Sequence, residues 1–143
     1  MSDYQNLEVW QKAMDLCVEI YNLIEKLPRE EKYALSDQMR RSVVSIASNI
    51  AEGRGRGSDK EFLHFLSMAM GSKCELETQL AICERLLFLG RNETKLAWQL
   101  CDIVGQKLFS LSNAIKRSIN KAKSYREKTK MLINSKRKGT AVG

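Results

Sequence analysis

Apolar side chains recur at alternating steps of three and four residues along most of this chain. The clearest run extends from Phe62 to Leu87, and only Lys73 interrupts its apolar stripe. A spacing near 3.5 residues is typical of amphipathic helices that pack almost parallel to one another. The chain also contains a single proline, Pro28. The pattern therefore predicts a few long helices and argues against a strand-rich fold.

Helix-breaking residues divide the first half of the pattern into two segments. The first helix is expected over residues 7–27, because Pro28 cannot continue it and restricts the residue before it. The second helix is expected to begin at Glu31 or Leu35 and to end at Glu52. Gly53 is then predicted to cap it in the left-handed conformation.

Start and stop signals also bound the other two helices. Ser58 and Glu61 form a capping box ahead of the third apolar run, and Gly90 is expected to end that helix. Asn92 is a favourable N-cap for the fourth helix. The apolar pattern of that helix fades near Asn120, where we expect the helix to end.

Four amphipathic helices with short connections predict an all-α fold, an antiparallel up-down-up-down four-helix bundle over residues 1–120. The third and fourth helices are apolar over more than one face, which favours burial in a homo-oligomer; the alternative is that they have wide core faces.

Gly71 lies in the middle of the third helix and predicts a close approach to another backbone. Lys73 is expected to pair with a nearby glutamate or to extend out to solvent.

Several simple signals bear on the type of protein. No apolar run reaches the length of about 18 residues that a membrane-spanning helix needs. The first residues also lack the basic and then apolar pattern of a signal peptide. These observations predict a cytoplasmic protein that makes no membrane contact. The cysteines are scattered and are predicted to be small core side chains: Cys17, Cys74, Cys83 and Cys101.

The sequence offers little material for catalysis or metal binding. Its one histidine, His64, lies on a polar line of the third helix and is predicted to be exposed. Glu61 and His64 have the spacing of one di-iron binding unit, but such a site needs two units and two further glutamates. Only symmetry-related copies could supply them. We therefore expect a non-enzymatic protein with no cofactor and no metal.

The net charge of +7 is concentrated at one end of the chain. Residues 1–120 hold equal numbers of basic and acidic side chains, whereas residues 121–143 hold eight basic side chains and one acid, Glu127. A neutral body with a basic, flexible tail indicates a polyanion partner, either nucleic acid or an acidic membrane, and of these we predict RNA or DNA; the alternative is a disordered, solubilising end. Tyr125 is the only aromatic residue of the tail, so base stacking is not expected. The predicted contacts are Lys121, Lys123, Arg126, Lys128, Lys130, Lys136, Arg137 and Lys138.

Two further arginine pairs are candidate phosphate ligands, because the planar guanidinium group donates two parallel hydrogen bonds. Arg40 and Arg41 lie on adjacent faces of the second helix. Arg41 has the alternative of pairing with Glu52 or with an acid of a neighbouring helix. Arg54 and Arg56 are expected in a flexible glycine turn, where the alternative is that they only aid solubility.

Several segments carry a resemblance to a known family. The chain resembles the bacterial four-helix bundle proteins, also called the 23S rRNA intervening-sequence protein family, over about residues 5–120. The resemblance rests on the segments 7–14 (LEVWQKAM), 38–42 (QMRRS), 45–53 (SIASNIAEG) and 71–80, which contains Gly71, Ser72, Glu75 and ETQL. The basic tail lies outside it.

The resemblance implies a homopentameric, barrel-like ring of four-helix bundles. Some members are encoded inside intervening sequences of ribosomal RNA genes. More distant relatives are accessory proteins of diversity-generating retroelements, which bind nucleic acid and a reverse transcriptase. No catalytic residues are implied, and the matching positions are expected to be architectural: Arg40, Arg41, Asn49, Glu52, Gly53, Gly71, Ser72 and Glu75. The two functions left open are nucleic-acid binding with a possible reverse transcriptase partner, and a protein-interaction ring with no nucleic-acid role.

Overall fold

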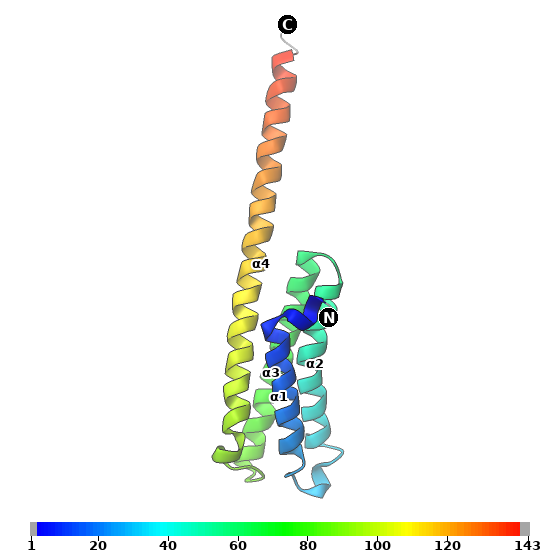
Figure 1. Cartoon of the computed structure of the whole chain (residues 1–143), viewed down its shortest axis with the longest axis vertical. Helices are drawn as coiled ribbons and strands as arrows, with labels where there is room; N and C mark the ends of the chain where they lie inside the picture. Colours follow the sequence, from blue (N-terminus) through cyan, green and yellow to red (C-terminus); the bar gives the residue numbers. More distant parts are fainter. Residues whose placement is uncertain (1–2, 141–143) are drawn as a thin grey trace.

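A computed structural model describes residues 3–140, and all regular structure in this range is helical. Its four long helices confirm the predicted all-α, four-helix fold (Figure 1). Within the described range, none of these helices combines the length and the apolar character needed to cross a bilayer. In chain order, the elements are η1 (Asp3–Asn6), α1 (Glu8–Ile24), η2 (Arg29–Glu31), α2 (Leu35–Gly55), α3 (Asp59–Arg85) and α4 (Arg91–Thr140).

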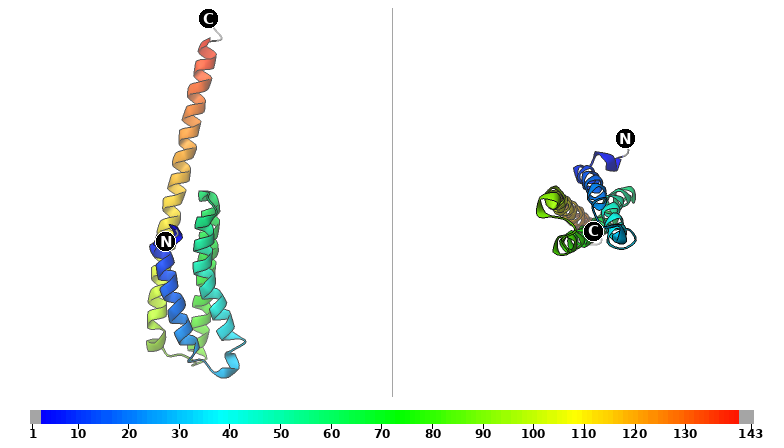
Figure 2. Two further views of the ribbon diagram at one scale, coloured as in Figure 1. Left: turned by 45° about the vertical axis from the view of Figure 1, so that its right-hand side comes forward. Right: turned by 90° about the horizontal axis from the view of Figure 1, so that it is seen from below.

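The four helices lie side by side, and α4 continues alone far beyond the other three (Figure 1). The turn between α2 and α3 lies at the end of the bundle from which α4 projects. The connections from α1 to α2 and from α3 to α4 lie at the opposite end. Seen along the long axis, the helices surround a common centre (Figure 2).

The core consists of the apolar stripes expected from the sequence, and each helix supplies part of it. Burying one such side chain contributes about 1.5–3 kcal/mol, so the stripes dominate the stability of the bundle. The largest side chains with less than 2% exposure include Leu16, Ile20, Leu23, Met39, Ile46, Ile50, Leu66, Leu76, Leu80, Val104 and Leu108.

Local signals fix one helix start as expected. The amide N–H of Glu61 donates to Ser58 Oγ at 3.2 Å, and Ser58 Oγ donates to the Glu61 carboxylate at 3.1 Å. The first contact is the N-cap half of the predicted capping box; the second joins the Glu61 carboxylate to the Ser58 hydroxyl and not to the Ser58 amide.

Glycine plays a different part from the one expected at two positions. Helix α2 continues through Gly53 to Gly55, and it is Gly57 that has a positive φ, of 84°. Gly53 is buried, and a Cβ there would lie 2.5 Å from Phe65 Cβ, so Gly53 lets α2 and α3 pack closely. Gly71 faces open space, so the predicted close approach at this position is wrong.

The connection between α3 and α4 also differs from the expectation. Helix α3 ends at Arg85 rather than at Gly90, because Leu87 adopts a φ of 60°. The Leu87 and Phe88 amides donate to the carbonyls of Glu84 and Cys83, at 3.1 and 2.9 Å. This is a Schellman motif with leucine in the position that glycine usually takes. Leu87 is consequently 89% exposed instead of part of the apolar stripe.

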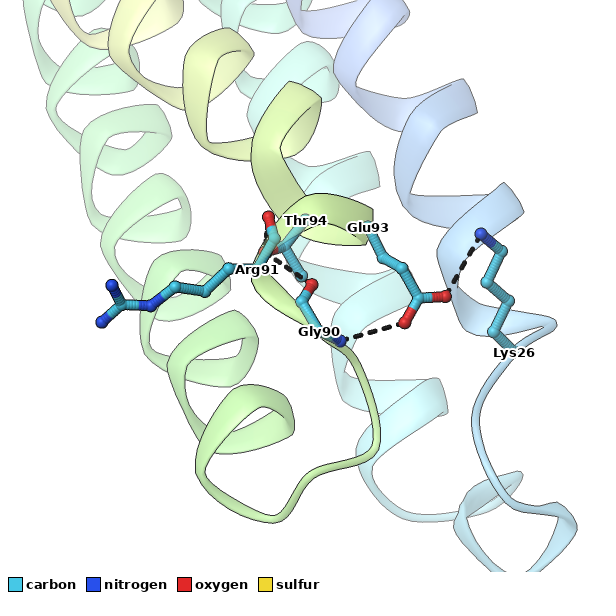
Figure 3. A network of polar contacts seen from close by, with 5 residues as sticks. All are labelled: Lys26, Gly90, Arg91, Glu93 and Thr94. Carbon is cyan, nitrogen blue, oxygen red and sulfur yellow. Dashed lines mark hydrogen bonds and ion pairs between the residues drawn. The ribbon is translucent and has the colours of Figure 1, made fainter.

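The start of α4 is capped by Glu93 and not by Asn92. Helix α4 begins at Arg91, and the Gly90 amide donates to Glu93 Oε1 at 3.0 Å (Figure 3). The other carboxylate oxygen of Glu93 pairs with Lys26 of the connection after α1, at 3.4 Å. These two contacts lower the pKa of Glu93 below its usual value, first through the Gly90 hydrogen bond. A carboxylate near a helix N-terminus is also favoured by the helix dipole.

The cysteines are less uniformly buried than expected. Cys83 and Cys101 lie in the core, where burial raises their pKa values to about 11 and about 12. Cys17 is half-buried, whereas Cys74 is exposed, so the prediction of a core position is wrong for Cys74.

Helix α4 is longer than the sequence pattern suggests. It continues without interruption to Thr140, so the expected end near Asn120 is wrong, and a helix stands where a flexible tail was expected. Every side chain from Asn120 to Thr140 is exposed. The segment is rich in Lys and Arg, which favour helix, lacks proline and has glycine only at Gly139, so intrinsic propensity favours helix without packing. The division of the chain at residue 120 stays a prediction.

Candidate nucleic-acid interface

The part of α4 that projects from the bundle is the most basic region of the molecule. We call residues 116–140 the α4 extension; it follows Ile115, the last buried residue of the helix. The extension contains one acid, Glu127, and ten basic residues, all exposed: Lys116, Arg117, Lys121, Lys123, Arg126, Lys128, Lys130, Lys136, Arg137 and Lys138.

The cations of the α4 extension have no acidic partners among the described residues. All ion pairs within residues 3–140 use basic residues at or before Lys107, which pairs with Glu8 at 2.7 Å. In the bundle, therefore, many positive charges are locally neutralised, whereas in the extension they face water. A polyanion can approach the extension without breaking existing ion pairs.

Seven of the ten basic residues of the extension form two rows on roughly opposite sides of the helix. The first row repeats every seven residues and consists of Lys116, Lys123, Lys130 and Arg137. The second row steps by four and seven and consists of Arg117, Lys121 and Lys128. Residues spaced by seven stay close to one side of a helix, with a drift of about 20° per heptad. The extension therefore presents positive charge along two of its flanks.

Between the two rows lies a narrow stripe of small and apolar side chains. It continues the three-and-four spacing of the buried residues of α4. It therefore lies on the same side of the helix as the residues that face the core up to Ile115. Glu127 is two residues from Tyr125 and from Thr129, which places the acid about 200° around the helix from the stripe. The stripe consists of Ser118, Ala122, Tyr125, Thr129 and Leu132, and the next step of four reaches the cation Lys136.

Arg40 and Arg41 lie on α2, away from the extension. Arg41 pairs with Asp37 of its own helix at 3.2 Å, so its expected pairing with Glu52 or with another helix is wrong. Arg40 is half-buried beside the groove that Tyr21 and Val44 line between α1 and α2. These two arginines therefore do not share one surface with the basic extension.

Arg54 and Arg56 are held in place rather than carried on a flexible turn. Arg54 pairs with Asp3 at 2.6 Å and lies over the Phe62 ring, 5.8 Å from its centroid. Arg56 pairs with Glu52 at 2.7 Å. Its guanidinium group also lies 5.1 Å from the centroid of the Phe65 ring. The end of α2 and its turn to α3, the segment that holds both arginines, lies at the bundle end from which the α4 extension projects (Figure 1).

Comparison with known families matches residues 5–110 to the model of the 23S rRNA-intervening sequence proteins. The chain belongs to this family. A crystal structure of a protein of unknown function from the S23 ribosomal protein family of Bacteroides thetaiotaomicron is also similar, with a TM-score of 0.68 and 28% sequence identity. The similarity covers 73% of this chain and 97% of that chain. A comparison with curated proteins finds no match.

The family match covers the bundle and ends before the extension. Within the matched part, residues that carried the resemblance form a polar seam between α2 and α3. Asn49 Nδ2 donates to the Ser45 carbonyl at 2.8 Å, and the hydroxyls of Ser45 and Ser72 are 2.9 Å apart. Ser42 Oγ donates to Glu75 at 3.5 Å. The Ser45–Ser72 and Ser42–Glu75 contacts join α2 to α3, whereas the Asn49 contact lies within α2.

Charged groups inside the bundle also serve packing. Lys73 is 9% exposed and pairs with Glu77, one of the partners expected for it. Burial is the largest single effect and lowers the pKa of Lys73, but the hydrogen bond to Glu77 and the charge of the Glu77 carboxylate together outweigh it, so the pKa is raised. Gly105 makes room for this lysine, because a Cβ there would lie 3.1 Å from Lys73 Cε. The sequence alone gave no sign of this role for Gly105.

Few side chains among residues 3–140 are arranged in a way that suits catalysis or metal binding. His64 is exposed, as predicted, and its ring packs edge-on against Phe65. Over residues 3–140, no three His, Cys, Asp or Glu side chains gather closely enough to hold a metal ion. The basic extension is therefore the main candidate for a functional surface.

Proposed function

We propose that this member of the 23S rRNA-intervening sequence family is a non-enzymatic, homo-oligomeric accessory protein that binds nucleic acid through the α4 extension. One observation carries this: the end of α4, which leaves the bundle after Ile119, holds ten exposed cations, none of them ion-paired among residues 3–140. Lys and Arg that neutralise phosphates release counterions, so affinity should fall steeply with salt. Contacts of this kind position a protein on nucleic acid but carry little sequence information.

A salt titration tests this function directly. Full-length protein and a variant ending at Asn120 are compared for binding to labelled RNA and DNA, with circular dichroism to confirm that the shortened bundle is folded. We expect the full chain to bind and the shortened variant to lose most of the affinity and of the salt slope. Equal affinities without a salt slope would contradict the proposal.

Self-assembly is a further part of the proposal. Side chains on α1 leave an apolar stripe uncovered at Met14, Val18 and Tyr21, which are 39%, 62% and 44% exposed. A second copy would bury such a stripe. We therefore propose the homopentamer that the family resemblance implies, built from helices in antiparallel up-down-up-down order. Turns at alternate ends of the bundle support that order (Figure 1). Sedimentation at a mass five times that of the 16.4 kDa protomer would support the pentamer, and a monomer would exclude it.

The cellular context belongs to the same proposal. We place the protein in the cytoplasm without membrane contact, with a reverse transcriptase of a diversity-generating retroelement as the possible protein partner. A gene beside a reverse transcriptase and a repeat template would support this context. A gene inside a ribosomal RNA intervening sequence would instead favour the other branch of the family.

A protein-interaction ring without a nucleic-acid role is the second candidate. It is favoured by the neutral charge of residues 1–120 and by the family match, which covers the bundle alone. Affinity capture from lysate with and without nuclease separates the two functions. Partners that survive nuclease, with no co-purifying nucleic acid, would favour the ring.

A further inference from the structure

We propose that the α4 extension binds double-stranded DNA by lying in its major groove. This inference rests on the nucleic-acid binding proposed above and names the class of nucleic acid. Beyond Ile119, the last residue that packs on the core, the extension runs for 21 residues to Thr140 and is about 32 Å long, enough to cross the major groove of a duplex. A single α-helix of about 10–12 Å diameter fits the major groove of B-form DNA, which is about 12 Å wide.

The placement of the cations favours a groove over a flat contact. A helix in the major groove has the phosphates of one strand on each side. The first row, with Lys123 and Lys130, and the second row, with Lys121 and Lys128, lie on opposite flanks of the extension. Each row can therefore meet one strand, while Glu127 lies on the side away from the stripe and hence away from the groove floor.

The stripe between the rows suits the floor of a groove. Ser118 and Thr129 can hydrogen-bond to base edges, and the methyl groups of Ala122 and Thr129 can contact thymine methyl groups. From Ser118 to Leu132 the stripe holds no Arg, Lys, Asn or Gln, the residues that make paired contacts to bases. We therefore expect the extension to distinguish the form of the nucleic acid much more strongly than its sequence.

Other nucleic acids fit the extension less well. The major groove of A-form RNA is deep and narrow, and side chains cannot read it. Single strands are held by stacking bases on several aromatic side chains, whereas the extension has Tyr125 alone. Duplex DNA is the form that matches both the straight helix and its two basic rows.

Other occupants of this face are also disfavoured. A coiled-coil partner needs large apolar residues at the three-and-four positions, but Ser118, Ala122 and Thr129 occupy most of them. A membrane surface needs a broad apolar face, and the side of the helix between the basic rows offers only three large apolar residues, Tyr125, Leu132 and Ile133.

A comparison of three probes tests the choice of nucleic acid. Full-length protein is titrated with a DNA duplex of about 20 base pairs, roughly two helical turns, with an RNA duplex of the same sequence, and with one DNA strand. We expect the DNA duplex to bind at least about tenfold more tightly than either alternative. Equal or tighter binding of the RNA duplex or the single strand overturns this inference alone. Absence of binding to all three probes overturns the proposed function itself.

A proline variant tests whether the helix matters beyond its charge. Ser124→Pro interrupts the extension without changing any charge, and Ser124→Ala is its matched control. We expect Ser124→Pro to weaken binding of the DNA duplex about tenfold, because a kinked helix cannot follow the groove. Binding of the single strand should change little. Equal duplex affinity for the two variants would show that a charged tail suffices, which contradicts binding in the groove.

Paired substitutions test the two-row geometry. The variants K123Q/K130Q and K121Q/K128Q each remove two charges, from the first and the second row respectively. Each should reduce the slope of log affinity against log salt by up to about 2. The variant R85Q/K95Q removes the same charge at the opposite bundle end and should leave the slope unchanged. A loss confined to one row would place the DNA on one side of the helix and contradict the proposal.

Discussion

Helix α4 is stabilised in two different ways along its length. Up to Ile115 its apolar stripe is buried against the other helices, whereas from Asn120 to Thr140 every side chain is exposed. In the bundle, packing holds the helix. In the extension, helix-favouring residues continue an existing helix and so avoid the cost of nucleation. The two regions of α4 therefore differ in what they contribute: the first is part of the packed bundle, and the second exposes positive charge to solvent.

The same contrast appears in the electrostatics. Bundle cations such as Lys26, Arg54 and Lys107 are paired with carboxylates. The cations of the extension are not, within the part of the chain that the structure describes. Exposed ion pairs contribute little to stability, about 0–1 kcal/mol, so their main effect in the bundle is to neutralise charge. The positive electrostatic potential that no carboxylate neutralises is therefore concentrated at the extension.

The largest expected difference between the two regions concerns leucine truncation. Leu80→Ala removes a fully buried side chain and should lower the free energy of unfolding by about 2–5 kcal/mol. Leu132→Ala removes an exposed side chain of the extension and should change it by less than about 0.5 kcal/mol. Denaturant unfolding of both variants measures this. Similar losses would mean that the extension is packed against something and would contradict the comparison.

A glycine pair sharpens the account of packing within the bundle. Gly53→Ala places a Cβ against Phe65 and should destabilise the protein by about 1–3 kcal/mol. Gly71→Ala, in open space on α3, should stabilise it by up to about 1 kcal/mol, because alanine favours helix. Thermal unfolding should thus give shifts of opposite sign. Shifts of the same sign would count against the close contact at Gly53.

The turn at Leu87 gives a smaller effect. Leu87 adopts the left-handed conformation with an exposed side chain. Leu87→Gly should therefore stabilise the bundle by about 1 kcal/mol, because glycine lacks the strain of a Cβ in this conformation. Denaturation midpoints of this variant and of Leu86→Gly, a control at a right-handed position, measure the effect. A loss at Leu87 equal to that at Leu86 would argue against the Schellman geometry.

The smallest effect is the pH dependence of Glu84. Hydrogen bonds from Thr94, at 2.7 Å, and then from Trp98, at 2.8 Å, lower the pKa of Glu84 below its ordinary value of 4.5. Since the folded-state pKa is the lower one, this stabilisation is present above pH 4.5 and is lost as the pH falls through the folded pKa. In a Trp10→Phe background, Trp98 fluorescence should titrate with a midpoint below 4.5. A midpoint at or above 4.5 would contradict the hydrogen bonds.

Much of the bundle could be predicted from the sequence, because its determinants are local. The three-and-four spacing gave the buried stripes, and Ser58 and Glu61 gave a helix start. The partner of Lys73 was among the acids within one helical turn. Features that depend on how one helix packs against another could not be predicted from the sequence. From the sequence, Gly53 is predicted to be a helix cap, but its role is to let α3 pack closely against α2. Leu87 is predicted to belong to the apolar stripe, but it lies in the turn after α3.

The candidate interface divides in the same way. Charge alone identifies the basic residues of the tail but not their helical arrangement, because the apolar pattern that predicts α4 fades near Asn120. Helix propensity after Asn120, with no glycine before Gly139, was the available signal. The partners of Arg54 and Arg56 were out of reach, because Asp3 and the aromatic rings come close only in the folded chain.

Hydrogen exchange on the full-length protein, with and without a DNA duplex, tests the separation of roles most directly. Without DNA, amides of residues 120–140 should exchange much faster than those of the bundle core, because no tertiary packing covers them. With DNA, we expect exchange to slow over residues 116–140 and to stay unchanged in α1, α2 and α3. Protection confined to the bundle, with an unaltered extension, would contradict the account.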